Sequence, residues 1–367
     1  MSGQSLLVLG AGSLARAICY AFATVGTTQS TVTVASRTPS RAADVCYVAE
    51  VRAALAGTSI GFRPQCIRHY SADDLLPLLE EQAPAVVVNC ASPQSPWERI
   101  SSPSAWTDLI ATAGFGMTLP LQAAIPIEAG NALLRAHSDA LFVNASFPDA
   151  VNPLLRHLNL PVFCGIGNVA LLEASLRQEL GLGQGEQLRV LGHHWHLHPP
   201  PSAAEEALAW RGGVRIENVR ELLARQRETA RQELNVVNGH VTALLLDALL
   251  TRREVRMNLP GPHGLPGGYP VRVHDRRVLL DLPRGWTRER AAEANQRWGR
   301  HDGVVVDESG KVSFFRRGGE DIGPLVPELA GSLRAGDVPE LLPELLALRV
   351  RLRKRPPAST PRGRTVG

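Results

Sequence analysis

The 367-residue sequence has few cysteines, few aromatic residues and almost no lysine. Its five cysteines (Cys19, Cys46, Cys66, Cys90 and Cys164) are odd in number and contain no Cys-x-x-Cys pair, which argues against a disulfide framework. No apolar run reaches about 18 residues, so we expect no transmembrane helix. A strand is expected almost at residue 1, which leaves no room for a signal peptide. These absences predict a cytoplasmic protein with reduced thiols and no membrane partner.

Lysine occurs only at positions 311 and 354, so arginine supplies nearly all the positive charge behind the net charge of +4. Much of the excess lies in Arg351–Pro357, which continues to Gly367 in serine, threonine, proline, glycine and arginine. Such a composition predicts a disordered basic tail over 351–367. No aromatic residues interleave these charges, so we expect no nucleic-acid partner.

The remaining composition is that of a globular protein, with 44% hydrophobic and 20% charged residues over a length that suits two domains. Residues 1–144 alternate strand and helix, which predicts an α/β domain with a doubly wound parallel sheet. Residues 145–350 read as a second, mixed α/β domain. There we expect a helix over 218–250, whereas 258–270 is too rich in proline and glycine for regular structure.

A glycine-rich turn follows the first predicted strand, Leu6–Leu9, and opens a helix-forming segment, Ala15–Val25. Gly10, Ala11, Gly12, Ser13 and Leu14, with Ala15, fit the G-x-G-x-x-A dinucleotide fingerprint. Gly10 allows the tight turn, Gly12 lets a pyrophosphate approach the backbone, and the helix N-terminus offers free N–H groups. The alternative is an ordinary glycine-rich turn that binds nothing.

The second predicted strand, 31–35, ends in Ser36, Arg37, Thr38 and, a helical turn on, Arg41. NAD-preferring sites usually place an acidic residue here, on the ribose hydroxyls. A hydroxyl and two guanidiniums can instead hydrogen-bond a 2′-phosphate. The sequence therefore favours NADP(H), with NAD possible as the cofactor; the alternative is two solvated arginines at a helix start.

The buried strand at 85–89 ends in Cys90, Ala91 and Ser92. In open α/β sheets ligands bind in loops at the carboxyl ends of such strands. We therefore expect these three residues to contact the cofactor.

The order of elements over residues 5–285 resembles the lactate/malate dehydrogenase superfamily, which also includes the NAD-dependent family 4 glycosidases. The matching segments are Val86–Arg99, Gly165–Asn168 with Glu173 and Arg177, Val190–His194, and Asn258–Val271. The sequence departs from the family where 146–149 lacks the asparagine of an Asn-Pro-x-Asp motif and where 195–197 replaces Gly-Asp-Ser. The resemblance implies an N-terminal Rossmann domain, a C-terminal substrate and dimerisation domain, and a homodimer.

The resemblance also implies which side chains carry chemistry. His194 would be the proton donor, Glu173 would orient it, and Arg177 would bind a substrate carboxylate. Because Glu173 and Arg177 are four apart on one predicted helix, they could instead pair with each other. His194 could equally be an ordinary polar loop residue.

The histidines after the strand at 188–191 also allow a metal site, which we do not predict. If the strand continued, alternate residues His194, His196 and His198 would share a face and could hold zinc. No spaced carboxylate partner is evident, so we expect no bound metal.

The sequence thus predicts an NAD(P)H-dependent oxidoreductase that reduces a ketone or imine of a small substrate, such as a specialised metabolite. The alternatives are a metal-assisted, NAD-dependent glycosidase-like enzyme and a non-catalytic NADP-binding sensor or scaffold.

Overall fold

The computed structural model describes residues 4–183, 185–317 and 319–358. Its N-terminal half contains a six-stranded parallel sheet in the order β3-β2-β1-β4-β5-β6. The strands are β1 (Gln4–Leu9), β2 (Ser30–Ser36), β3 (Ile60–Cys66), β4 (Val86–Asn89), β5 (Leu141–Asn144) and β6 (Cys164–Gly165). The order reverses between β1 and β4, and ligands of open α/β sheets bind at such a switch point. The expected Rossmann fold is confirmed.

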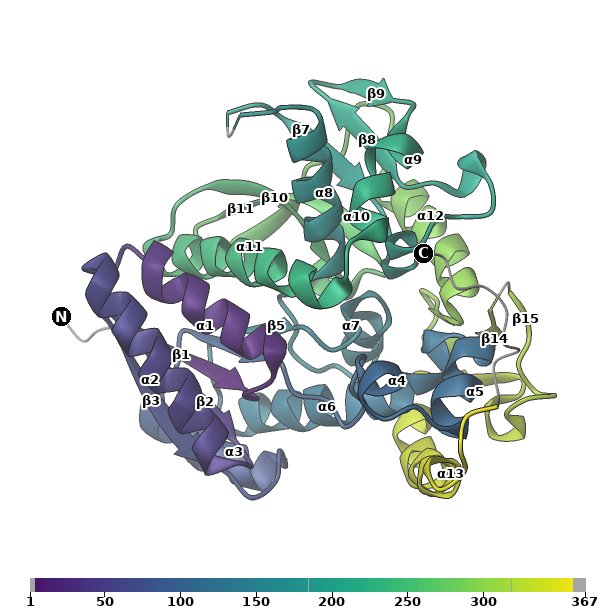
Figure 1. Ribbon diagram of the computed structural model, residues 1–367, viewed down its shortest axis with the longest axis horizontal. Helices are drawn as coiled ribbons and strands as arrows, with labels where there is room; N and C mark the ends of the chain where they lie inside the picture. The colour runs from purple at the N-terminus through teal and green to yellow at the C-terminus, as the bar shows by residue number, and fades with distance from the viewer. Residues whose placement is uncertain (1–3, 184, 318, 359–367) are drawn as a thin grey trace, which may run out of the picture.

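Alternation along β1 explains how the sheet carries helices on both faces. Leu6 and Val8 belong to one hydrophobic core, and Leu7 and Leu9 to the other. The first face is covered by α1 (Ser13–Val25), α2 (Pro39–Ala56) and α11 (Arg231–Thr251), and the second by α3 (Ala72–Gln82), α6 (Leu119–Arg135), α7 (Pro148–His157) and α13 (Leu342–Arg353). Figure 1 shows α1, α2 and α11 side by side in front of the strands.

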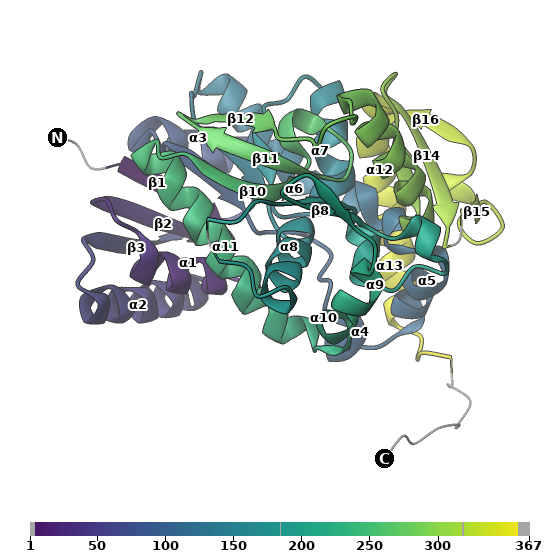
Figure 2. The same ribbon diagram turned by 90° about the horizontal axis from the view of Figure 1, so that it is seen from above.

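The C-terminal half is a mixture of antiparallel sheets and helices. Three groups of strands pair: β7-β8-β9, β10-β11-β12, and β14 with β13, β15 and β16. Their bounds are β7 (Leu188–Leu191), β8 (Leu208–Arg211), β9 (Val214–Ile216), β10 (Val255–Pro260), β11 (Gly268–His274), β12 (Arg277–Leu280), β13 (Val304–Val306), β14 (Lys311–Arg316), β15 (Glu320–Asp321) and β16 (Ser332–Arg334). Its helices include α8 (Asn168–Glu179) and α12 (Arg288–Asp302), with the short α9 (Val219–Leu222) and α10 (Ala224–Glu228). The short helices α4 (Glu98–Ser101) and α5 (Ala105–Ala113) belong to the N-terminal half, in the connection from β4 to β5. From above, the β10–β12 sheet lies over the N-terminal half (Figure 2).

Two expected elements differ from the structure. The segment 258–270 is partly regular, because β10 and β11 pair at its two ends, while most of its glycines and prolines lie in the connecting turn, 261–267. The single helix expected over 218–250 is broken into α9, α10 and α11.

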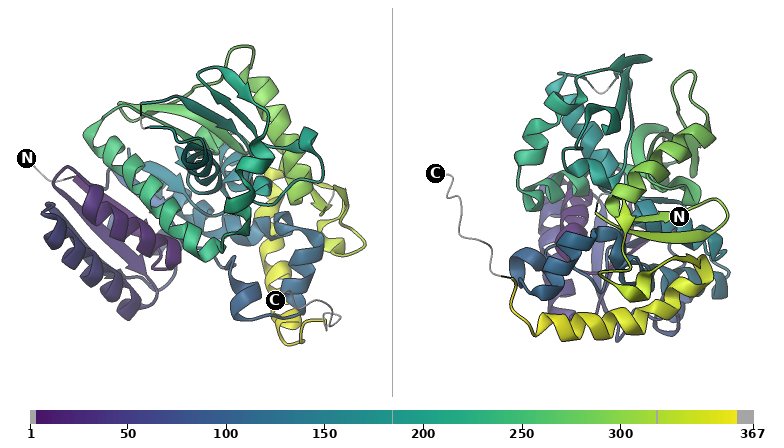
Figure 3. Two further views of the ribbon diagram at one scale, coloured as in Figure 1. Left: turned by 45° about the horizontal axis from the view of Figure 1, so that its top comes forward. Right: turned by 90° about the vertical axis from the view of Figure 1, so that its right-hand side faces the viewer.

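Two elements extend across the expected domain limits. The parallel sheet continues past residue 144, because β6 pairs with β5. The basic tail expected from 351 begins inside α13, and the Arg355 carbonyl accepts the Ala105 N–H at 3.1 Å. The chain thus returns to the N-terminal half, and α13 runs along its lower edge (Figure 3). Residues 359–367 of the expected tail lie outside the described residues.

Helix α11 is, within the described part of the chain, the one helix long and apolar enough to cross a membrane. Half of that apolar stretch is buried inside the fold, and α11 packs along α1. Its composition is therefore explained by its place in the core.

Candidate functional site

The glycine turn and the loop after β4 lie against each other. Gly10 has a φ of +107°, and its N–H donates to the Ala35 carbonyl at 2.8 Å. A Cβ atom at Gly10 would lie 3.2 Å from the Ala91 nitrogen and the Cys90 carbonyl. Only glycine suits both the backbone angle and this approach. The structure thus brings together the two segments that the sequence predicted to hold a cofactor.

The N-terminus of α1 is open. Gly12 caps the helix without a side-chain bond, no acidic residue follows in the first turn, and nothing lies within 4 Å of a Cβ built on Gly12. The first N–H groups of a helix lack intrahelical partners and attract anions. This end of α1 therefore fits a dinucleotide pyrophosphate, with Ala11 and Leu14 half-buried beside it.

Two side chains from distant segments meet at this helix end, and the sequence analysis gave no sign of the second, Asn235. The Ser13 hydroxyl accepts hydrogen bonds from Trp97 Nε1 at 3.2 Å and from Asn235 Nδ2 at 3.0 Å. Trp97 belongs to the loop after β4, and Asn235 to α11. The bonds tie that loop and the C-terminal half to the start of α1.

At the end of β2, Ser36 is buried and its hydroxyl accepts the Thr38 N–H at 3.1 Å. Arg37 and Arg41 are exposed. The Arg37 guanidinium lies 5.6 Å from the centre of the Tyr70 ring, a cation–π distance. Tyr70 was not predicted, since it comes from the connection after β3.

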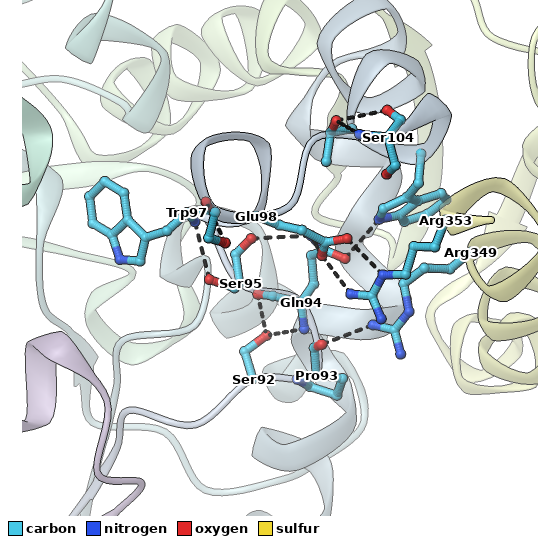
Figure 4. A network of polar contacts seen from close by, with 12 residues as sticks. Ser92, Pro93, Gln94, Ser95, Trp97, Glu98, Ser104, Arg349 and Arg353 are labelled. Atoms are coloured by element: carbon cyan, nitrogen blue, oxygen red, sulfur yellow. Dashed lines mark hydrogen bonds and ion pairs between the residues drawn. The ribbon is translucent and has the colours of Figure 1, made fainter. Parts of the chain in front are cut away.

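The Ser92 hydroxyl donates to Gln122 Oε1 at 2.7 Å, which fixes the start of the loop after β4 on α6. The rest of this loop is held from the C-terminal end of the chain, as Figure 4 shows. Arg353 of α13 pairs with the buried carboxylate of Glu98, with Nε at 2.7 Å from Oε1. Arg349 donates to the Pro93 carbonyl at 2.8 Å.

His194 follows β7 and is fixed by two aspartates. Its backbone N–H donates to Asp149 Oδ1 at 2.8 Å, and its Nδ1 lies 2.8 Å from Asp302 Oδ2. The rings of Phe115 and Phe147 flank the imidazole at 5.2 and 5.6 Å. Asp149, at the start of α7, is the acidic residue of the altered Asn-Pro-x-Asp segment.

Asp302 and His194 each favour the charged form of the other. Burial by itself would lower the pKa of His194, but the charge and hydrogen bond of Asp302 raise it above its usual value. Burial by itself would raise the pKa of Asp302, but the charge and hydrogen bond of His194 lower it. With Nδ1–H donated to Asp302, Nε2 is the ring nitrogen left to act on a ligand.

The expected contact between Glu173 and His194 is wrong. Glu173 accepts a hydrogen bond from Arg177 Nη2 at 2.8 Å, the i, i+4 pairing within α8. Arg177 also donates to the carbonyls of Gly183 and Glu186 at 2.9 and 3.0 Å. Its guanidinium thus secures the turn after α8 and does not line the cleft described below.

No local signal in the sequence pointed to Asp302. It ends α12, 108 residues after His194, and only the tertiary fold joins them.

The histidine segment is a 3₁₀-helix over His194–Leu197, and not the continued strand that a metal site would need. His196 Nδ1 accepts the His193 N–H at 2.9 Å, and His196 Nε2 donates to the Glu205 carbonyl at 2.9 Å. Burial lowers the pKa of His196 to about 3, so it is a neutral structural residue. Within residues 4–183, 185–317 and 319–358, no group of three or more histidine, cysteine, aspartate or glutamate side chains could hold a metal ion.

A cleft of about 230 Å³ opens beside the His194–Asp302 pair. One wall is the loop after β4, from Gln94 to Arg99, and another is the Trp195 ring, stacked on His301 at 4.5 Å. Arg99, Arg231 and Arg317 also line it. Trp195 thus lies in the cleft, whereas Trp97 contacts Ser13.

Comparison with known proteins identifies the fold. No protein-family model and no curated protein sequence matches this chain. Among solved structures, it is similar to malate dehydrogenase from Plasmodium falciparum in complex with NADH (TM-score 0.51, 10% identity, covering 80% of this chain and 94% of that one). It is also similar to malate dehydrogenase from Picrophilus torridus, with a TM-score of 0.55 and 15% identity, over 81% of this chain and 94% of that one. A third similar structure is lactate dehydrogenase from Cryptosporidium parvum complexed with lactic acid and nicotinamide adenine dinucleotide, with a TM-score of 0.50 and 15% identity, over 82% of this chain and 96% of that one. The chain therefore has the malate and lactate dehydrogenase fold, with a Rossmann half followed by an α/β half.

Proposed function

We propose that the protein is an NADP(H)-dependent oxidoreductase that reduces a ketone or imine, with His194 as the proton donor. The observation that carries this proposal is the His194–Asp302 ion pair beside the cleft. The same loop that walls the cleft reaches the open N-terminus of α1 through Trp97. The proton donor and the dinucleotide cradle thus share one loop, which suits transfer between a cofactor and a small substrate.

The reduced nicotinamide would supply the hydride to the carbonyl or imine carbon. His194 then gives the Nε2 proton to the oxygen or nitrogen, which completes the two-electron reduction. Asp302 holds Nδ1–H and stabilises the imidazolium, so that the donor is charged before transfer. Asp149 acts only through the His194 backbone and is a positioning residue.

NADP(H) is the preferred cofactor in this proposal, with NAD(H) as the alternative. Two exposed arginines, Arg37 and Arg41, and no acidic residue stand at the end of β2. Stacking on Tyr70 orients the Arg37 guanidinium without using its N–H groups, which leaves them for a 2′-phosphate.

Two measurements test the proposal. Calorimetric titration should give tighter binding of NADPH than of NADH; equal or absent binding of both would contradict the cofactor assignment. On a panel of ketones and imines, His194→Asn should lower kcat by about 10²–10⁴ while NADPH affinity stays nearly unchanged. The exposed His240, on α11, provides a matched control, and His240→Asn should leave kcat unchanged. NADPH binding without turnover of any compound would instead favour a sensor or scaffold.

We further propose that the protein is a cytoplasmic homodimer. All five cysteines are free thiols, as expected in a reducing compartment. Along α2, Tyr47, Val48, Val51 and Leu55 form an exposed apolar stripe, and a two-fold contact would bury this stripe against its own copy. Light scattering after size-exclusion chromatography checks the mass, and a monomer would refute the dimer.

A further inference from the structure

The cleft beside His194 contains more positive charge than its own acidic groups neutralise. Its two carboxylates are already paired, Glu98 with Arg353 and Asp302 with His194. The arginines of the lining, Arg99, Arg231 and Arg317, make no ion pair with any described residue. The cleft therefore presents three uncompensated guanidiniums.

Arg231 is the most constrained of the three. It begins α11, is half-buried, and places Nη2 2.8 Å from His198 Nε2. Because a guanidinium only donates, the His198 Nε2 atom must accept. Burial, with the charge of Arg231, lowers the pKa of His198 to about 4. His198 is therefore a neutral group that orients Arg231 and leaves the other N–H groups of Arg231 free.

Arg317, which directly follows β14, lines the same cleft as Arg231. The positive charges of Arg317 and Arg231 both oppose protonation of His198, and the charge of Arg231 also opposes protonation of His194. Two cations from distant parts of the chain thus converge next to the proton donor. A partly buried guanidinium without a counterion costs free energy, and an anionic ligand removes that cost.

The dinucleotide does not account for these charges. Its proposed phosphate contacts lie elsewhere, at the N-terminus of α1 and at Arg37 and Arg41. Even if Arg99 turned from its loop toward the pyrophosphate, Arg231 and Arg317 would remain for the substrate. A single carboxylate would neutralise only one of them.

We propose that Arg231 and Arg317, with His198, form a subsite for a doubly charged anionic portion of the substrate. The substrate class is then a compact carbonyl or imine compound that carries a phosphate monoester or two carboxylates. This inference rests on the proposed function for the identity of the reacting group, but the anion subsite itself can be measured without turnover.

The test is calorimetric titration of the protein, with saturating NADP⁺ and without it, by glycolate, tartronate and 2-phosphoglycolate. These probes carry one carboxylate, two carboxylates, and a carboxylate with a phosphate. Tartronate or 2-phosphoglycolate should bind at least tenfold more tightly than glycolate. Preference for phosphoglycolate identifies a phosphorylated substrate, and preference for tartronate a dicarboxylate. Equal binding of all three, or no binding, overturns the subsite even where NADPH binding and the His194 result stand.

Variants locate the subsite. Arg231→Gln should weaken the preferred dianion by about tenfold or more, the usual effect of losing one charge-assisted hydrogen bond. Arg317→Gln changes an exposed residue, so the fold is retained, and it should act in the same direction. Arg272→Gln removes an equal charge from the exposed surface of β11 and should leave binding unchanged. The same loss in all three variants would show a net-charge effect and would refute the assignment.

Discussion

Replacing Asp302 by asparagine should lower the pKa of His194. The carboxylate lies 2.8 Å from Nδ1 in a buried pair, and the amide keeps the shape while removing the charge. A charge-assisted hydrogen bond is worth about 1.5–3 kcal/mol. At 1.36 kcal/mol per unit, this corresponds to a fall of about 1–2 pKa units. Burial then lowers the pKa of His194 with only the charge of Asp149 left to oppose it, so the imidazole is protonated to a smaller extent at a given pH.

The assay is NMR titration of histidine labelled at ring carbon Cε1, with the His194 signal assigned by its loss in His194→Asn. Glu173→Gln is the matched control, because Glu173 pairs with Arg177 and does not touch His194. It should leave the titration of His194 unchanged. An unchanged His194 titration in Asp302→Asn, or a shift in Glu173→Gln, would refute the reasoning.

Asp302→Asn should also change how the free energy of unfolding depends on pH. The raised pKa of His194 means that its stabilising contribution is complete below the unfolded-state value, about 6.5, and is lost as pH rises through the raised value. The lowered pKa of Asp302 means that its contribution is complete above about 4 and is lost as pH falls. The difference in free energy of unfolding between the parent protein and Asp302→Asn, measured in urea, should therefore be greatest near pH 5–6. A difference that grows above pH 8 would contradict the ion pair.

Three further substitutions test the rest of the site. Arg37→Ala should weaken the binding of NADPH more than that of NADH and change the ratio of their dissociation constants at least tenfold. One charge-assisted hydrogen bond contributes about 1.5–3 kcal/mol. Equal weakening of both cofactors would exclude a 2′-phosphate contact. Gly10→Ala should lower the free energy of unfolding by about 1–2 kcal/mol, because alanine is strained at a φ of +107°, and should reduce NADPH affinity; a neutral result in both assays would refute the cradle. Arg353→Gln should leave the buried Glu98 carboxylate without its cation and accelerate amide hydrogen exchange over 94–99. Exchange in α2, which covers the opposite face of the sheet from α13, should not change.

The sequence predicted the parts of the molecule that local rules determine. The G-x-G-x-x-A turn identified β1, α1 and their junction, because the motif needs a strand before it and a helix after it. The alternation of strands and helices along residues 1–144 identified the doubly wound sheet, because alternating elements are typical of a parallel sheet covered by helices.

The rest depends on contacts between distant segments. Spacing placed Glu173 and Arg177 on one face of a helix, but could not show that they satisfy each other there. The partner of His194 came from the end of α12, and Tyr70 and Asn235 reached the nucleotide site from separate elements. Polar residues that cooperate across more than 100 positions leave no periodic signal.

The contact between α13 and the loop after β4 has a consequence for how the protein is made. The Rossmann strands leave the ribosome early, and N-terminal regions generally begin to fold during synthesis. Glu98, however, is buried against a cation that is translated 255 residues later. Until Arg353 has been made, the Glu98 carboxylate lacks the cation with which it pairs in the folded protein. The site thus becomes complete only after α13 has been made, and a chain that stops before α13 would leave the loop without its anchor.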